Sequence, residues 1–249
     1  MVISHKYKFI FVKTAKTAGT SIEMLLSPLC SDHDVFTPFA FPEEGHTPRN
    51  YRGLFNPIPE LISGTRAGGL RSNRWSETIR DLKYRRKFSM HLPAWRIRCR
   101  VPREVWHQYF KFCAERNPYD KIISGYYYYN WKHGSFVSLD EYLAFCSRRI
   151  KKRKHGVGVC PFNIVNYTDP LTGEVIVDRV LRFEQMDVEL TAVFSELEIP
   201  FDPPLTIHAK GQIRKDRRPY QEVFTDRQRA VVSELFQEEI ELHGYTFEG

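Results

Sequence analysis

An apolar run, a short polar loop and an amphipathic segment follow one another in residues 9 to 26, FIFVKTAKTAGTSIEMLL. The aromatic and β-branched residues of 7 to 13 predict a strand, residues 14 to 19 a loop, and the residues from about Thr20 a helix. This order constrains the fold most, because a strand that leads through a tight loop into a helix is typical of α/β proteins.

The polar loop has the properties of an anion site. Consecutive backbone N–H groups after a strand can point inward, and the following helix adds its positive end. The N–H groups concerned are those of Thr17, Ala18, Gly19, Thr20 and Ser21. Gly19 allows a close approach of the backbone, the hydroxyls of Thr20 and Ser21 add donors, and Lys16 adds a mobile cation. The lysine precedes the glycine, so the magnesium-holding Gly-Lys-Ser/Thr order is absent. A simpler interpretation stays open, in which Gly and Thr only cap the helix.

A second strand, loop and helix arrangement follows a short predicted helix at 102 to 108, with a strand at 109 to 115 and a helix from near Pro118. In RNPYDKIISGYY, residues 116 to 127, Ser124 follows Arg116 by about two helical turns. An arginine fork and a hydroxyl could together hold a terminal phosphate. Alternatively, Arg116 only pairs with Asp120, and Asn117-Pro118 only starts the helix.

The rest of the chain completes an α/β pattern. Residues 31 to 75 are rich in Pro, Gly and Asn and predict irregular structure with at most short helices. Residues 174 to 183 read as a strand, and 186 to 197 and 225 to 242 as amphipathic helices. We expect one domain over residues 1 to 249, with a mainly parallel central sheet flanked by helices and one long loop-rich region of the kind that is often functional. Ligands of such sheets bind at the carboxyl ends of the strands, where both loops would lie.

Charge and cysteine content narrow the class of partner and the compartment. The formal net charge of +7 favours an anionic partner but does not distinguish nucleic acid, a phosphorylated or sulfated ligand and an anionic membrane. The 5 cysteines are scattered without a CxxC pair, which argues against a disulfide framework or a zinc knuckle and favours a reducing compartment. No apolar run approaches the roughly 20 residues of a membrane span, and the first strand comes too early for a signal peptide. We therefore expect a soluble, cytoplasmic protein.

Taken together, KTAGTS and RNPYDKIIS resemble the motifs of the PAPS-dependent sulfotransferases, particularly the group with carbohydrate and heparan 2-O-sulfotransferases. The first resembles the family's 5′-phosphosulfate loop and the second its 3′-phosphate motif. The likeness extends to FSMHLPAWRIR, to VDRVLRFEQM and to the end of the chain, YQEVFTDRQRAVVSELFQEEIELHGYTF. It implies a P-loop-like sheet with a loop-rich acceptor region, PAPS as co-substrate, no metal, and a hydroxylated acceptor such as a carbohydrate. Ala15 stands where relatives usually have proline, which leaves the rigidity of the loop open.

The resemblance also suggests further site residues. A hydroxyl acceptor benefits from a general base, and relatives carry one between the two motifs, so we select His91 in SMHLPA with Lys16 as the second catalytic residue. Without the resemblance, a lone histidine is more often an ordinary surface or core residue. The segment 208 to 220, HAKGQIRKDRRPY, either closes over the nucleotide through Arg214 and Lys215 or is a solvated basic loop.

Several features stay ambiguous. The aromatic run 126 to 131 can stack on a ring or fill the core, and the basic run 148 to 155 can grip an anionic glycan or end a helix in solvent. Arg182 and Glu184 can line the site, but structural support is the expected role. A P-loop nucleotide kinase and a non-catalytic basic glycan- or nucleic-acid-binding module are the alternative functions, although no nucleic-acid motif is recognisable and we expect no such partner. Sequence leaves the acceptor's identity and the oligomeric state open.

Overall fold

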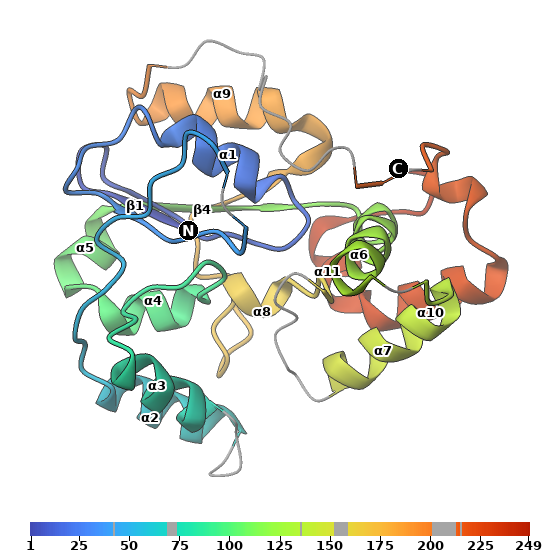
Figure 1. The fold of residues 1–249 in the computed structure, drawn as a ribbon, viewed down its shortest axis with the longest axis horizontal. Helices are drawn as coiled ribbons and strands as arrows, with labels where there is room; N and C mark the ends of the chain where they lie inside the picture. Colours follow the sequence, from blue (N-terminus) through green and yellow to red (C-terminus); the bar gives the residue numbers. More distant parts are fainter. Residues whose placement is uncertain (42, 69–73, 135, 152–158, 201–212, 215) are drawn as a thin grey trace.

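A computed structural model describes residues 1–249 except 42, 69–73, 135, 152–158, 201–212 and 215. Its centre is a five-stranded sheet with the strand order β3-β1-β2-β4-β5 (Figure 1). The strands are β1 (Val2–Ser4), β2 (Phe9–Phe11), β3 (Val35–Phe36), β4 (Phe110–Glu115) and β5 (Arg179–Arg182). The pairs β2–β4 and β4–β5 are parallel, whereas β1 runs antiparallel to both of its neighbours. The predicted parallel arrangement is therefore confirmed for the central and β5 side of the sheet and wrong for β1.

Helices cover both faces of the sheet and extend beyond one end of it (Figure 1). They are α1 (Gly19–Leu26), α2 (Ile58–Gly68), α3 (Arg74–Lys83), α4 (Ala94–Arg100), α5 (Arg103–Gln108), α6 (Pro118–His133), α7 (Leu139–Lys151), α8 (Ile164–Tyr167), α9 (Met186–Glu196), α10 (Asp226–Leu235) and α11 (Gln237–His243). Short 3-10 turns form at Phe183–Gln185 and Tyr220–Glu222. In Figure 1, α1 and α9 lie on one side of the sheet, α4 and α8 on the other, and α6, α7, α10 and α11 group at the end of β4.

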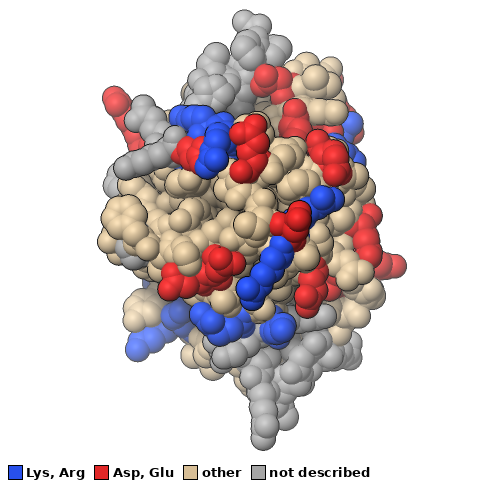
Figure 2. All heavy atoms as spheres, turned by 90° about the vertical axis from the view of Figure 1, so that its right-hand side faces the viewer, with Lys and Arg blue, Asp and Glu red and all other residues tan. Residues whose placement is uncertain are grey.

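Positive and negative side chains alternate over the face near α10 and α11. Figure 2 views the molecule from this side and shows Lys and Arg among Asp and Glu side chains with uncharged residues between them. The net charge of +7 is therefore not displayed as one basic surface on this face.

Among the described residues, no helix combines the length and the apolar character needed to cross a membrane.

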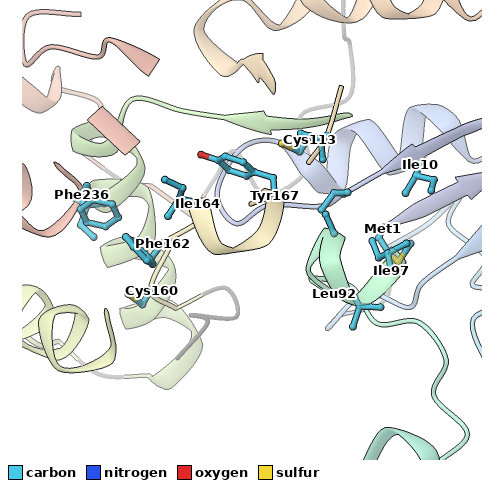
Figure 3. Close-up of a cluster of buried hydrophobic side chains, with 14 of the residues drawn as sticks. Met1, Ile10, Leu92, Ile97, Cys113, Cys160, Phe162, Ile164, Tyr167 and Phe236 are labelled. Atoms are coloured by element: carbon cyan, nitrogen blue, oxygen red, sulfur yellow. The ribbon is translucent and has the colours of Figure 1, made fainter. Parts of the chain in front are cut away.

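Alternation along the strands builds two cores, one on each face of the sheet. Phe9 and Phe11 pack in a cluster with residues of α1 and α9, whereas Ile10 faces the opposite cluster with residues of α4 and α8. Figure 3 shows the second cluster, with Tyr167 and Cys113 between a group around Phe236 and a group around Leu92. Both cores meet the sheet beside the loop that follows β2, so that loop starts from a rigid support.

Local signals predicted several elements closely and others poorly. The strand at 109 to 115, the helix from Pro118 and the short helix at 102 to 108 are confirmed as β4, α6 and α5. The predicted strands 7 to 13 and 174 to 183 are shortened to β2 and β5.

Other predictions need correction. The region 31 to 75 is not wholly irregular, because it contains β3, all of α2 and the first residues of α3. The expected helix at 225 to 242 breaks at Phe236 into α10 and α11. No strand was predicted at β1, because its three residues are too few to show a clear alternation. The expectation of a single domain stays a prediction.

Candidate active site

A cleft of about 440 Å³ opens at the carboxyl ends of β2 and β4, a volume within the usual range of ligand sites. Nearly all the site residues predicted from the sequence line it: Lys16, Thr17, Ala18, Gly19, Thr20, Ser21, His91, Arg116, Ser124 and Arg214. Lys215, the remaining predicted contact, lies outside the described residues, as does much of the segment 208 to 220 and of the basic run 148 to 155. The cleft thus brings together both motifs, which are about 100 residues apart in the chain.

The loop before α1 has an unusual backbone. Lys16 and Ala18 adopt left-handed conformations with φ of 65° and 59°, which cost roughly 1–2 kcal/mol for a residue that is not glycine. Ala18 is the N-cap of α1 and has no side chain that could bond the N–H groups of the first turn. These N–H groups are therefore suited to bind an anion in the cleft.

Contacts from outside the loop hold this backbone in place. The hydroxyls of Thr14 and Thr17 lie 2.7 Å apart, and the Thr14 hydroxyl also donates to the carbonyl of Ala114 on β4. The side-chain amide of Asn163 bonds both backbone groups of Ala15. The Ala15 N–H donates to Asn163 Oδ1 (2.8 Å), and Asn163 Nδ2 donates to the Ala15 carbonyl (3.0 Å). A proline at this position would lack the N–H group, so alanine gains here a bond that proline could not make.

Packing disfavours a side chain at Gly19. A Cβ atom added to it would lie 2.8 Å from Cγ of Lys13, whose buried side chain crosses beneath the start of α1. The Lys13 ammonium is 3.4 Å from Oε1 of Glu23, which is fully buried in α1. The sequence suggested that Gly19 makes room for a ligand; in the structure, the space beside its Cα is occupied by Lys13.

Lys16 approaches an aromatic ring of α6. Its ammonium lies 4.5 Å from the centre of the Tyr128 ring, within the range of a cation–π contact. Tyr128 is largely buried and lines the cleft. Of the aromatic run 126 to 131, this residue therefore faces the site and supports a cation.

His91 lies on the other side of the loop with its ring fixed. Nδ1 is 3.0 Å from the carbonyl oxygen of Lys13. Burial, followed by the positive charge of Lys13, lowers the pKa of His91 from 6.5 to about 3. The ring is therefore neutral at physiological pH, and its Nδ1–H donates to the Lys13 carbonyl. Nε2 then carries the lone pair and can accept a proton.

Arg116 pairs with Asp120, as one of the two sequence interpretations has it, and it also lines the cleft. Its guanidinium pairs with Asp120 through Nε (2.9 Å) and Nη2, lines the cleft, and lies 4.1 Å from the centre of the Phe183 ring. Arg214 joins the same carboxylate, with Nη1 2.7 Å from Asp120 Oδ1. Asp120 therefore holds two cleft arginines in fixed orientations.

The start of α6 and the segment after β5 are also as expected. Asn117 caps α6 by accepting from the Tyr119 N–H, and its own N–H donates to Glu184 Oε1 (2.7 Å). Arg182 donates to the carbonyl of His243. Glu184 and Arg182 thus make structural contacts between elements, the role favoured for them from the sequence.

Sequence reasoning missed three cations of the cleft, Lys13, Lys132 and Arg217, and the pair of hydrogen bonds between Asn163 and Ala15. Lys132 could have been found, because Ser124, Tyr128 and Lys132 recur at the four-residue spacing of one helix face. The contact of Asn163 with Ala15 could not have been predicted, since no motif or periodicity near Asn163 indicates it. Among the residues that the structure describes, no group of three or more His, Cys, Asp or Glu side chains is arranged to hold a metal ion.

The fold and the cleft define an α/β protein with a ligand site that is lined by positively charged side chains and lies between two strand, loop and helix units.

No model of a known protein family matches the sequence. An uncharacterized protein of Archaeoglobus fulgidus is 32% identical over 111 residues, which are 44% of this chain and 84% of that protein. The chain belongs to the same family as this archaeal protein. The crystal structure of a sulfotransferase from Alicyclobacillus acidocaldarius aligns with 91% of this chain and 94% of its own, with a TM-score of 0.41 and 16% identity.

Proposed function

We propose that this protein is a PAPS-dependent sulfotransferase that moves the sulfuryl group to a hydroxyl of an acceptor such as a carbohydrate. One observation carries the proposal: the loop with Lys16, the pair Arg116 and Ser124, and His91 all line one cleft. The sequence likeness of the two loops to the phosphosulfate and 3′-phosphate motifs assigns these groups their roles.

The cleft's residues fit a ligand with anionic groups at two ends. The uncapped N–H groups of α1 and the Lys16 ammonium suit a phosphosulfate, and the fork of Arg116 with the Ser124 hydroxyl suits a 3′-phosphate. Lys132, Arg214 and Arg217 add positive charge along the same cleft. No residue in this set depends on a metal ion for its role.

The transfer needs charge stabilisation more than covalent help. A bond forms between the acceptor oxygen and sulfur while the bond from sulfur to the 5′-phosphate oxygen breaks. Lys16 and the α1 N–H groups stabilise the negative charge that develops on the leaving phosphate oxygen. Nε2 of His91 takes the proton from the acceptor hydroxyl, because Nδ1 is bonded to the Lys13 carbonyl. The lowered pKa keeps the ring neutral before transfer, and it also makes Nε2 a weaker base than an ordinary imidazole.

Purified protein incubated with PAPS and a panel of hydroxylated acceptors should release 3′,5′-diphosphoadenosine. Lys16→Ala should weaken PAPS binding and slow transfer, and His91→Ala should lower turnover by roughly 10²–10⁴-fold with little change in PAPS affinity. His107→Ala is the matched control, because His107 is exposed on α5 and does not line the cleft. Absence of PAPS binding by calorimetry refutes the proposal. Magnesium-dependent turnover of ATP would instead favour a nucleotide kinase.

The cytoplasmic location is part of the same proposal. All of the cysteines, Cys30, Cys99, Cys113, Cys146 and Cys160, are free thiols in the structure, which supports a reducing compartment. Cell fractionation with thiol labelling tests it: recovery in a membrane or secreted fraction, or oxidised thiols in the native protein, would contradict it.

A further inference from the structure

A buried polar cluster lies directly behind the Lys16 loop. Glu115 at the end of β4 and Glu239 of α11 share the ammonium of Lys121, with Lys121 Nζ 2.6 Å from Glu115 Oε1. All three side chains are almost completely excluded from solvent. Such a cluster is rigid, because breaking any one of its contacts leaves a buried charge without compensation.

Asn163 connects this cluster to the loop. Its backbone N–H donates to Glu239 Oε1 (2.6 Å), as does that of Ile164 (2.9 Å), so the residue is held by its main chain. Its side-chain amide then makes both bonds to Ala15, and Nδ2 also lies 3.1 Å from Glu115 Oε1. Asn163 has 0% exposure, and no described neighbour of the loop other than Asn163 bonds both the N–H and the carbonyl of Ala15.

The orientation of this amide is determined by its neighbours. Nδ2 faces two acceptors, the Ala15 carbonyl and the Glu115 carboxylate, and Oδ1 faces the Ala15 N–H donor. A flipped amide would place oxygen against oxygen twice and N–H against N–H once, so only one orientation is satisfied. A side chain that both donates and accepts is therefore needed at this position.

We propose that Asn163 is a positioning residue that fixes the backbone of Ala15 and thereby keeps Lys16 directed into the cleft. Lys16 and Ala18 hold left-handed conformations that the chain does not favour by itself, so bonds from outside must select them. Asn163 supplies two such bonds at the residue next to Lys16. The effect on the loop stands on geometry alone, whereas the effect on turnover rests on the proposed sulfotransferase function.

The test compares wild type, Asn163→Ala, Asn163→Asp and a control, Thr168→Val. Thr168 is also buried beside α8, and its hydroxyl donates to the Ile164 carbonyl (2.7 Å) without touching the loop. The control therefore removes a buried hydrogen bond from the same segment. Asn163→Asp keeps the volume and the acceptor for the Ala15 N–H, but it replaces the donor by a carboxyl oxygen that faces the Ala15 carbonyl and Glu115. It therefore disrupts one of the two Ala15 bonds without leaving a cavity and serves if the alanine variant does not fold.

Amide hydrogen exchange measures the loop without any substrate. We expect exchange at residues 15 to 18 to rise at least about 10-fold in both Asn163 variants and to stay unchanged in Thr168→Val. In PAPS turnover we expect kcat to fall about 10–100-fold, with a smaller change in KM, because a displaced Lys16 stabilises the transition state less well.

Unchanged loop exchange in the Asn163 variants overturns the inference, and so does an equal effect of Thr168→Val. If wild-type protein neither binds nor turns over PAPS, the proposed function fails, while the exchange measurement still decides whether Asn163 positions the loop.

Discussion

Gly19→Ala tests whether the glycine of the loop is needed for packing or for ligand approach. The added Cβ would lie 2.8 Å from Cγ and 3.2 Å from Cε of Lys13, well inside the roughly 3.5–4.0 Å of a normal carbon contact. Lys13 has little freedom to move away. It is 3% exposed, its ammonium is 3.4 Å from Glu23, and it lies 4.2 Å from the centre of the Phe39 ring.

The magnitude follows from two opposing effects. Overpacking of a buried site costs about 1–3 kcal/mol, and alanine in a helix gains about 0.5–1 kcal/mol over glycine. The free energy of unfolding of the ligand-free protein should therefore fall by about 1–2 kcal/mol. Urea unfolding followed by circular dichroism measures this loss, and the slope of the transition should not change.

A double-mutant cycle with Lys13→Ala isolates the contact. This second change removes the atoms that Cβ would meet, so Gly19→Ala should then be neutral or slightly stabilising, which gives a coupling of about 1–3 kcal/mol. If Gly19→Ala leaves the ligand-free protein as stable as wild type but abolishes PAPS binding, the packing argument is wrong and the ligand requires the glycine.

Two further predictions concern groups of the cleft. Because the folded-state pKa of His91, about 3, lies below its unfolded value of 6.5, its contribution to stability is complete above pH 6.5 and is lost as the pH falls toward 3. Imidazole ¹⁵N spectra should accordingly show the neutral Nδ1–H form throughout about pH 5 to 8, and a titration midpoint near 6.5 would contradict the burial argument. Lys132→Ala should weaken binding of 3′,5′-diphosphoadenosine only about two- to fivefold, because its ammonium is exposed to solvent. Calorimetry should find no change for Lys151→Ala, an exposed lysine of α7 outside the cleft; equal effects of the two variants would mean that only net charge matters.

The parts of the site that could be predicted are those with local signals. Asn117-Pro118 starts α6 through a cap and a proline, both readable from neighbouring residues, and the polar loop before α1 follows a strand pattern. The hydrogen bonds between Asn163 and Ala15 join positions 148 residues apart, and no periodicity or motif near either residue indicates that contact. The left-handed backbone conformation of Lys16 could not be predicted for the same reason, since groups elsewhere in the chain select it.

Fixed orientation, more than total charge, distinguishes this cleft from a generally basic surface. Arg116 and Arg214 are both held by Asp120, so this group of two positive charges and one negative charge carries a single net positive charge. The attraction for a phosphate there depends on N–H groups that are already aimed, with less entropy to lose on binding. Lys16 is likewise supported by the ring of Tyr128. A ligand with two correctly spaced anionic groups therefore gains more from this cleft than a polyanion attracted by charge alone.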